Sequence, residues 1–215
     1  MLSAVNVSAP ILDVVPGARG HILQALCRST GPASGREVAR RAGVPVSTAA
    51  SVLADLVQTG IVGQLPFANS YGYQLNVKHL LARAIIEMAG AHVDLTKAIR
   101  EHVSGWKIQP VAGWLYGSTA RGDGDRASDI DLLFVLPDGD IDRDWWEEYQ
   151  VAALMDMVNG LTGNRVQYLP HTIDSFLALE RSRSPFTDNL HVDGIDLVDG
   201  SWRRISQARS TAAST

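Results

Sequence analysis

The sequence predicts an α+β protein made of two units, a small helical unit with a β-hairpin and a larger unit built on β-strands. Two observations support this prediction. Helical periodicity followed by two strand-like runs fills the region before residue 78, and apolar strand-like runs with polar loops recur after residue 110. The 215 residues include 46% hydrophobic and 20% charged side chains, which is enough apolar material for a packed core.

Charge is distributed unevenly along the chain. Residues 1–78 carry six basic and three acidic side chains, a net charge of +3, whereas the remainder carries 13 basic and 20 acidic side chains, a net charge of −7. The total of −4 excludes a strongly basic nucleic-acid coat, and the asymmetry indicates two units with different partners. No apolar run is long enough for a membrane span, and the N-terminus lacks the pattern of a signal peptide. We therefore expect a cytoplasmic protein without a membrane partner.

The first unit, residues 10–78, is predicted to contain three short helices and a hairpin. Apolar residues share one face of Arg19–Cys27, which indicates the first helix. Ser34 can cap a second helix over GREVARRAG, and Ser47 can cap a third over STAASVLADLVQ. Two strand-like runs follow, IVGQL and YGYQLNV, with PFANS as the turn between them.

This order of elements resembles a winged helix-turn-helix domain, in which the later helix of the pair enters the DNA major groove. One interpretation is DNA binding, and the other is a protein-contact or dimerisation module without DNA affinity. The third helix has no Lys or Arg, although cations supply most of the affinity for DNA. The candidate contacts are basic side chains on the preceding helix, for phosphates, and hydroxyls on the third helix, for base edges. These residues are Arg36, Arg40, Arg41, Ser47, Thr48 and Ser51.

A linker helix is predicted over residues 79–106, because its apolar side chains recur along one stripe. Packing between the two units is the default role of this helix, and partner binding is the alternative. The second unit is expected at residues 109–205. Residues 206–215 are small and polar, which predicts a disordered tail.

The segment that carries chemistry is residues 111–136. An apolar strand-like run ends at Gly117 and Ser118, an Arg-, Gly- and Asp-rich region follows, and Asp129 and Asp131 open a second strand. Gly117 permits a sharp turn and close approach of the backbone to a ligand. Ser118 is expected at the start of the next helix, where exposed N–H groups attract phosphate.

The two carboxylates favour a cation. On a strand, Asp129 and Asp131 point to the same face, about 6.6 Å apart along the chain. Like charges held this near repel each other unless a cation lies between them. Mg²⁺ suits such a site, because it takes one or two carboxylates and completes its shell with water and substrate phosphates. Arg121 can hold phosphate oxygens with its planar guanidinium group.

This pattern resembles the Gly-Ser-x₁₀-Asp-x-Asp signature of the nucleotidyltransferase superfamily related to DNA polymerase β. The most similar branch is the minimal nucleotidyltransferases, several of which act in toxin–antitoxin pairs. The matching positions are Gly117, Ser118, Ala120, Arg121, Gly122, Ser128, Asp129, Ile130 and Asp131. The resemblance implies a mixed sheet flanked by helices on one side, with RVQYL as the third core strand and with Trp145 facing inward from the helix before it.

The resemblance also implies an activity, in which an acceptor hydroxyl attacks the α-phosphorus of a metal-held nucleoside triphosphate and pyrophosphate leaves. Asp129 and Asp131 would be the catalytic, metal-binding carboxylates, with Mg²⁺ or Mn²⁺ as the cofactor. The nucleotide-binding residues would be Gly117, Ser118, Arg121 and Ser128. Active relatives usually add a third acid, but the aligned position here holds Gln167, whose carbonyl can bind metal but cannot act as a base. We expect nucleotide binding with slow or absent transfer, unless Asp174 or Glu180 replaces the missing acid.

Three functions remain open from the sequence. The first is an enzyme that transfers a nucleoside monophosphate to a hydroxyl, on a cognate toxin or another protein. The second is a DNA-binding regulator, a homodimer among the options, whose catalytically weak domain senses nucleotide or a partner protein. The third is antibiotic nucleotidylation, which has no need of a DNA-binding module. A tRNA acceptor is disfavoured, because a unit of net charge −7 repels polyanions.

Overall fold

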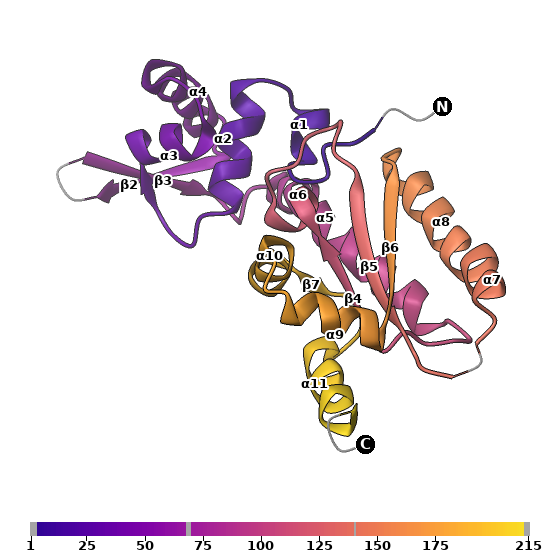
Figure 1. The fold of residues 1–215 in the computed structure, drawn as a ribbon. Helices are drawn as coiled ribbons and strands as arrows, with labels where there is room; N and C mark the ends of the chain where they lie inside the picture. Colours follow the sequence, from indigo (N-terminus) through magenta and orange to yellow (C-terminus); the bar gives the residue numbers. More distant parts are fainter. Residues whose placement is uncertain (1–3, 68–69, 140, 213–215) are drawn as a thin grey trace. The chain divides into compact units, whose positions relative to one another are not determined.

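The computed structural model describes residues 4–67, 70–139 and 141–212, and the chain divides into two compact units (Figure 1). One unit is Ala9–His92, and the other combines Met1–Ser8 with Val93–Thr215. This division falls inside the predicted linker helix rather than at its two ends. Among the described residues, no helix is both long and apolar enough to cross a membrane.

The unit of residues 9–92 combines short helices with a small antiparallel sheet, as the sequence predicts. Its elements are α1 (Ile11–Val14), α2 (Ala18–Cys27), β1 (Ala33–Ser34), α3 (Gly35–Ala42), α4 (Val46–Gln58), β2 (Val62–Phe67) and β3 (Ser70–Leu75). The strand order is β1-β3-β2, and both pairs are antiparallel. The strands extend into the predicted PFANS turn, whose two central residues, 68–69, lie outside the described residues.

Local signals set the helix ends of this unit. The Ser34 hydroxyl accepts a hydrogen bond from the Glu37 amide at 3.3 Å at the start of α3. Gly43, in the left-handed region with φ 64°, follows the end of α3. The predicted cap at Ser47 is wrong. Pro45, in an extended conformation, leads directly into α4, so Ser47 lies inside the first turn.

The second unit is built on a four-stranded mixed sheet. Its strands are β4 (Ala112–Tyr116), β5 (Ile130–Leu136), β6 (Val166–Thr172) and β7 (Ile195–Asp196), in the order β6-β5-β4-β7. Strands β5 and β6 are parallel, and the other pairs are antiparallel. The helices are α5 (Ala82–Ser104), which spans the division between the units, α6 (Gly117–Arg121), α7 (Arg143–Trp145), the π-helical turn η1 (Trp146–Val151), α8 (Ala152–Thr162), α9 (Ile173–Arg181), α10 (Pro185–Asp193) and α11 (Ser201–Ala212).

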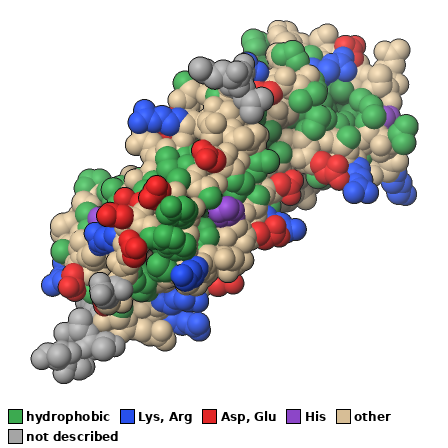
Figure 2. All heavy atoms as spheres, turned by 90° about the vertical axis from the view of Figure 1, so that its right-hand side faces the viewer, with side chains coloured by type: hydrophobic (Ala, Val, Ile, Leu, Met, Phe, Trp, Pro, Cys, Tyr) green, Lys and Arg blue, Asp and Glu red, His purple; other side chains and the backbone are tan. Residues whose placement is uncertain are grey.

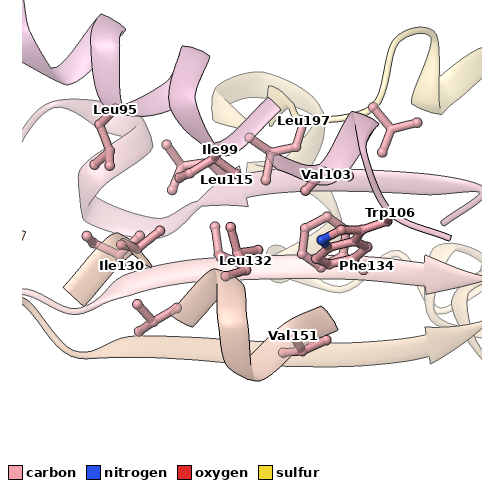
Figure 3. Close-up of a cluster of buried hydrophobic side chains, with 14 of the residues drawn as sticks. Leu95, Ile99, Val103, Trp106, Leu115, Ile130, Leu132, Phe134, Val151 and Leu197 are labelled. Carbon is pink, nitrogen blue, oxygen red and sulfur yellow. The ribbon is translucent and has the colours of Figure 1, made fainter. Parts of the chain in front are cut away.

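Helices pack on both faces of this sheet, so the predicted one-sided arrangement is wrong. On one face, Leu95, Ile99 and Val103 of α5 pack against β4 and β5, as Figure 3 shows. On the other face, Trp114 stacks on Phe176 of α9, with 5.2 Å between ring centroids. The physical reason is that the central strands are apolar at nearly every position and must be covered on both sides.

Two predictions about the helices of the second unit are wrong. Trp146 is fully buried where Trp145 was expected, because the π-helical turn η1 starts at Trp146 and shifts the helical repeat. Trp145 instead lies at the surface beneath the Lys107 ammonium group, 5.1 Å from the ring centroid. The predicted disordered tail is helical as far as Ala212, because α11 buries Ile205 against the sheet.

A fragment that begins at Gln109 is expected to lose the fold of the second unit. It lacks four core side chains of the α5 region that are each at most 7% exposed: Leu95, Ile99, Val103 and Trp106. Each contributes about 1.5–3 kcal/mol by burial, and the sum is comparable to a typical domain stability of about 5–15 kcal/mol.

A fragment that begins at Val93 keeps these side chains and serves as the control. Circular dichroism during thermal unfolding should show a cooperative transition for the longer fragment only. A cooperative transition of equal midpoint in both fragments would contradict the assignment of the second half of α5 to this core.

Candidate functional site

The candidate site lies where β4 ends and where β5 and β6 begin. Asp131 pairs with Tyr116 in the antiparallel ladder and with Gln167 in the parallel ladder. Residues that pair directly across strands point to the same face of a sheet. The structure therefore brings Tyr116, Asp131 and Gln167 into one row, on the face that carries α9 and α11.

The turn after β4 brings the backbone of Gly117 directly against Asp131. Gly117 has a φ of 74°, in the left-handed region that L-residues rarely adopt. A Cβ atom at this position would collide with the Asp131 carboxylate. The Gly-Ser turn and the Asp-x-Asp pair, separate in the sequence, are thus in contact in the fold.

The two carboxylates leave an excess of negative charge at this edge of the sheet. Burial and the negative charge of Asp129 raise the pKa of the Asp131 carboxyl above its ordinary value, and Arg121 opposes this shift. Arg121 itself forms an exposed ion pair with Asp123, at 3.1 Å. A bound cation would relieve the repulsion between Asp129 and Asp131.

Gln167 contacts the first of these carboxylates. Its side-chain Nε2 donates a hydrogen bond to Asp129 Oδ2 at 2.6 Å. In this orientation the amide nitrogen, rather than the carbonyl oxygen, faces the carboxylate, which differs from the predicted role of Gln167 as a metal ligand. Asp174 lies past the far end of β6, on α9, and Glu180 pairs with His191 at 3.0 Å.

The donor set fits a metal ion that arrives with a substrate. In the part of the chain that the structure describes, no group of three or more His, Cys, Asp or Glu side chains is arranged to hold a metal. Two carboxylates are nevertheless sufficient for Mg²⁺ when phosphate oxygens and water supply the remaining ligands. Asp129 and Asp131 therefore fit a Mg²⁺ ion whose other ligands are phosphate oxygens and water.

The Ser128 hydroxyl forms its hydrogen bonds within its own loop. Its hydroxyl accepts a hydrogen bond from the Asp125 amide at 2.9 Å, and it donates to the Asp125 carboxylate at 3.1 Å. The side-chain amide of Asn164 donates to the Ser128 carbonyl at 3.0 Å and fixes the same loop. Two residues of the site were not predicted from the sequence: Asn164, which contacts Val5 and Ser128 far away in the chain, and Tyr116, for which the adjacent Gly117 was the available signal.

In the first unit, two of the three candidate phosphate contacts are tied to an acid on the same helix. Arg40 and Arg41 bind the Glu37 carboxylate at 2.7 and 2.6 Å. The hydrogen bonds from Arg40 and Arg41 lower the pKa of Glu37 to about 2. The remaining candidates are exposed or half-exposed on α3 and α4: Arg36, Ser47, Thr48 and Ser51.

Acidic and basic side chains are interspersed with hydrophobic ones on the face that Figure 2 shows. This mixture agrees with the small net charge of the whole chain, −4. Electrostatic recognition of a polyanion must therefore depend on local groups such as Arg36 rather than on the overall charge.

Comparison with protein families assigns both units. Residues 95–164 match the nucleotidyltransferase domain family, and residues 20–66 match the IclR helix-turn-helix domain family. The chain carries a nucleotidyltransferase domain behind a helix-turn-helix domain. The match to the nucleotidyltransferase domain begins within α5, as the structural division does, and it ends before β6, so Gln167 lies beyond it.

Solved structures show only low overall similarity to this two-domain chain. AdcR, a zinc-dependent MarR family transcriptional regulator in its Zn(II)-bound state, is 27% identical over 40% of this chain, with a TM-score of 0.28; the match spans 58% of the length of AdcR. A toxin–antitoxin structure with AMP-PNP is 19% identical over 56% of this chain and 90% of that chain, with a TM-score of 0.31. TrmBL2, an archaeal chromatin protein, is 14% identical over 86% of this chain and 78% of that chain, also with a TM-score of 0.31. No curated protein matches the chain.

Proposed function

We propose that the second unit binds a nucleoside triphosphate with Mg²⁺ and transfers the nucleoside monophosphate to an acceptor hydroxyl. The observation that supports this most strongly is the contact between the Gly117 backbone and the Asp131 carboxylate. It places a turn that can approach phosphates beside a pair of carboxylates that need a cation. The family match over residues 95–164 supports the same class of chemistry.

This geometry supports the following roles for the residues. Asp129 and Asp131 hold the metal ion, and the Gly117 backbone, Ser118 and Arg121 contact the triphosphate. Mg²⁺, when bound, neutralises the phosphate oxygens and makes the α-phosphorus a better electrophile. The acceptor oxygen forms a bond to the α-phosphorus, the bond from that phosphorus to the bridging oxygen breaks, and pyrophosphate leaves.

A protein hydroxyl is the proposed acceptor, with a toxin or another protein as the partner. Residues 79–215 carry 13 basic and 20 acidic side chains, so a nucleic-acid acceptor would be repelled. Only positioning and charge neutralisation are required of this chain, apart from removal of the hydroxyl proton. Gln167 cannot accept that proton, because an amide is not a base, so the proton passes to a water molecule.

The hydrogen bond from Gln167 to Asp129 favours a second function, a DNA-binding regulator that senses nucleotide and transfers it slowly. At 2.6 Å, the amide N–H occupies a carboxylate oxygen that a metal would otherwise use. A third negative charge is absent at this position, so a second, acceptor-side metal is only weakly attracted. In this second function, nucleotide binding to the second unit changes DNA binding by the helix-turn-helix domain.

Nucleotide with Mg²⁺ is expected to stabilise the fold. Ligand at about 100 times its dissociation constant should add roughly 2.7 kcal/mol to the free energy of unfolding. Asp129→Asn combined with Asp131→Asn should abolish the Mg²⁺-dependent part, because the amides supply no negative charge. Urea unfolding with and without Mg²⁺ measures both effects.

The matched control for this test changes two exposed carboxylates of the same unit, Asp138→Asn with Asp156→Asn. It should keep the full stabilisation by nucleotide. If none of the four common nucleoside triphosphates stabilises the unaltered protein, both the transferase and the sensor functions are excluded.

Gln167→Glu distinguishes the transferase from the sensor. The new carboxylate restores a third acid beside Asp131, so we expect faster nucleotidyl transfer or tighter Mn²⁺ binding, together with lower stability of the metal-free protein. Transfer is measured with α-labelled nucleotide, and Gln207→Glu on the exposed side of α11 is the control. Vigorous transfer by the unaltered protein that Gln167→Glu leaves unchanged or lowers would show that another group removes the proton.

DNA binding by the first unit is expected to be weak and strongly salt-dependent. Arg36→Ala, Arg40→Ala and Arg41→Ala together should weaken it and flatten the plot of log K against log salt by about one for each phosphate that is no longer neutralised. Glu37→Gln should act in the opposite direction, because it releases Arg40 and Arg41 from their ion pairs. Fluorescence anisotropy with a labelled duplex measures both.

Arg83→Ala is the control for this measurement, since Arg83 is an exposed, ion-paired arginine on α5 of the same unit. Tight DNA binding that the triple change leaves intact would place the phosphate contacts elsewhere on this domain.

A further inference from the structure

The first described residues of the chain belong to the nucleotidyltransferase unit, although the rest of that unit begins at Val93. We call residues 4–8 the N-terminal strap. Val7 is 6% exposed and belongs to the hydrophobic core that α5 and α8 share with the sheet. The Val5 amide donates a hydrogen bond to the Thr162 carbonyl at 2.9 Å, at the end of α8. The strap is therefore anchored by both apolar and backbone contacts.

One buried side chain connects this strap to the signature loop. Asn164 is 2% exposed, and its Oδ1 accepts a second hydrogen bond from the Val5 amide at 3.2 Å. Its Nδ2 donates to the Ser128 carbonyl at 3.0 Å. A single amide group thus links the N-terminal strap to the loop that leads into Asp129.

Three hydroxyls meet around Gly124 in the middle of the same loop. The position that a Cβ of Gly124 would occupy lies 3.1 Å from Ser118 Oγ, 3.1 Å from Ser8 Oγ and 3.2 Å from Ser128 Oγ. Ser8 is 4% exposed, although serine is mostly found at the surface. The strap therefore ends beside Ser118, the serine of the Gly-Ser signature.

We propose that Ser8 is a positioning residue of the nucleotide site, which holds the loop of residues 122–128 against Ser118. This inference rests on the proposed function, because Ser118 matters only if a triphosphate binds there. A loop with glycines at 122 and 124 loses much conformational entropy on ordering, so it needs contacts from outside itself. Asn164 supplies a hydrogen bond to the Ser128 carbonyl, and the buried Ser8 hydroxyl packs beside Gly124.

Ser8→Ala in the full-length protein tests this role. Hydrogen–deuterium exchange of residues 122–128 should rise about tenfold, as expected when the buried Ser8 hydroxyl no longer packs beside Gly124, with the rest of the unit unchanged. The dissociation constants of Mg²⁺ complexes with ATP, GTP, CTP and UTP should rise by a similar factor for whichever of these nucleotides bind. Ser206→Ala, a change at an exposed serine of α11, is the control.

Gly124→Ala provides a second variant with the opposite steric change. The added methyl group meets the three hydroxyls and should also open the loop, whereas Gly160→Ala adds a methyl group with nothing within 4 Å and is the control. Removal of the Ser8 hydroxyl makes room for this methyl group. The Ser118 and Ser128 hydroxyls remain beside the methyl group, so the double variant Ser8→Ala with Gly124→Ala should lose less nucleotide binding than the sum of the two single losses, a non-additive result.

Two results would overturn the proposal. In one, Ser8→Ala behaves like Ser206→Ala in both measurements, or its effect adds fully to that of Gly124→Ala. In the other, exchange rises throughout the unit and the melting temperature falls, which would show a general packing role. If the unaltered protein binds none of the four nucleotides, the proposed function fails, and the exchange measurement still decides whether Ser8 holds the loop.

Discussion

The contact between Gly117 and Asp131 depends on the register of the central strands, and the rest of the site depends on that contact. Tyr116 pairs with Asp131 across β4 and β5, so the residue after Tyr116 has to turn at the carboxylate. A slip of one residue would exchange the two faces of the strand and remove the Asp131 side chain from the site. The register is held by burial on both faces, since Trp114 and Leu133 pack on one side and Leu115 and Leu132 on the other. The packing of the core on both faces of the sheet therefore sets the position of the Asp131 carboxylate beside Gly117.

The balance of charge at this edge explains why a neutral side chain is tolerated beside Asp131. Without a ligand, Asp129 and Asp131 repel each other, and this repulsion adds to the effect of burial, which is the larger cause of the raised pKa of Asp131. Gln167 lowers that cost, because its amide donates to Asp129 and adds no negative charge. A glutamate in the same place would attract a metal more strongly but would increase the repulsion in the metal-free protein. Stability without ligand and affinity for metal thus make opposite demands on this position.

Local and short-range features of the fold could be predicted from the sequence, and long-range ones could not. The Gly117 turn and the Asp-x-Asp pair follow from residue type and spacing, and the Ser34 cap follows from a rule that spans three residues. The burial of Trp146 in place of Trp145 depends on a π-helical turn that apolar periodicity at 3.6 residues does not register. The last helix was not predicted, because its residues are mostly small and polar and show no apolar periodicity around the buried Ile205. The roles of Ser8 and Asn164 arise from contacts between residues 36 to 159 positions apart, which no local pattern contains.

The order of the chain gives the N-terminal strap a consequence beyond the nucleotide site. Ser8 is the last residue of the nucleotidyltransferase unit before the helix-turn-helix unit begins at Ala9, and the chain returns through α5 at Val93. Both connections therefore start from segments that build the site or its core. Asn164 hydrogen-bonds both to the strap and to the loop that leads into Asp129, so the strap and this loop share one buried anchor. The strap is thus one of the two covalent connections between the nucleotidyltransferase unit and the helix-turn-helix unit, and it is the one that ends beside Ser118. If nucleotide binding restrains the strap, restraint of the strap by the helix-turn-helix unit strengthens nucleotide binding by an equal factor, because coupling between two binding events is reciprocal.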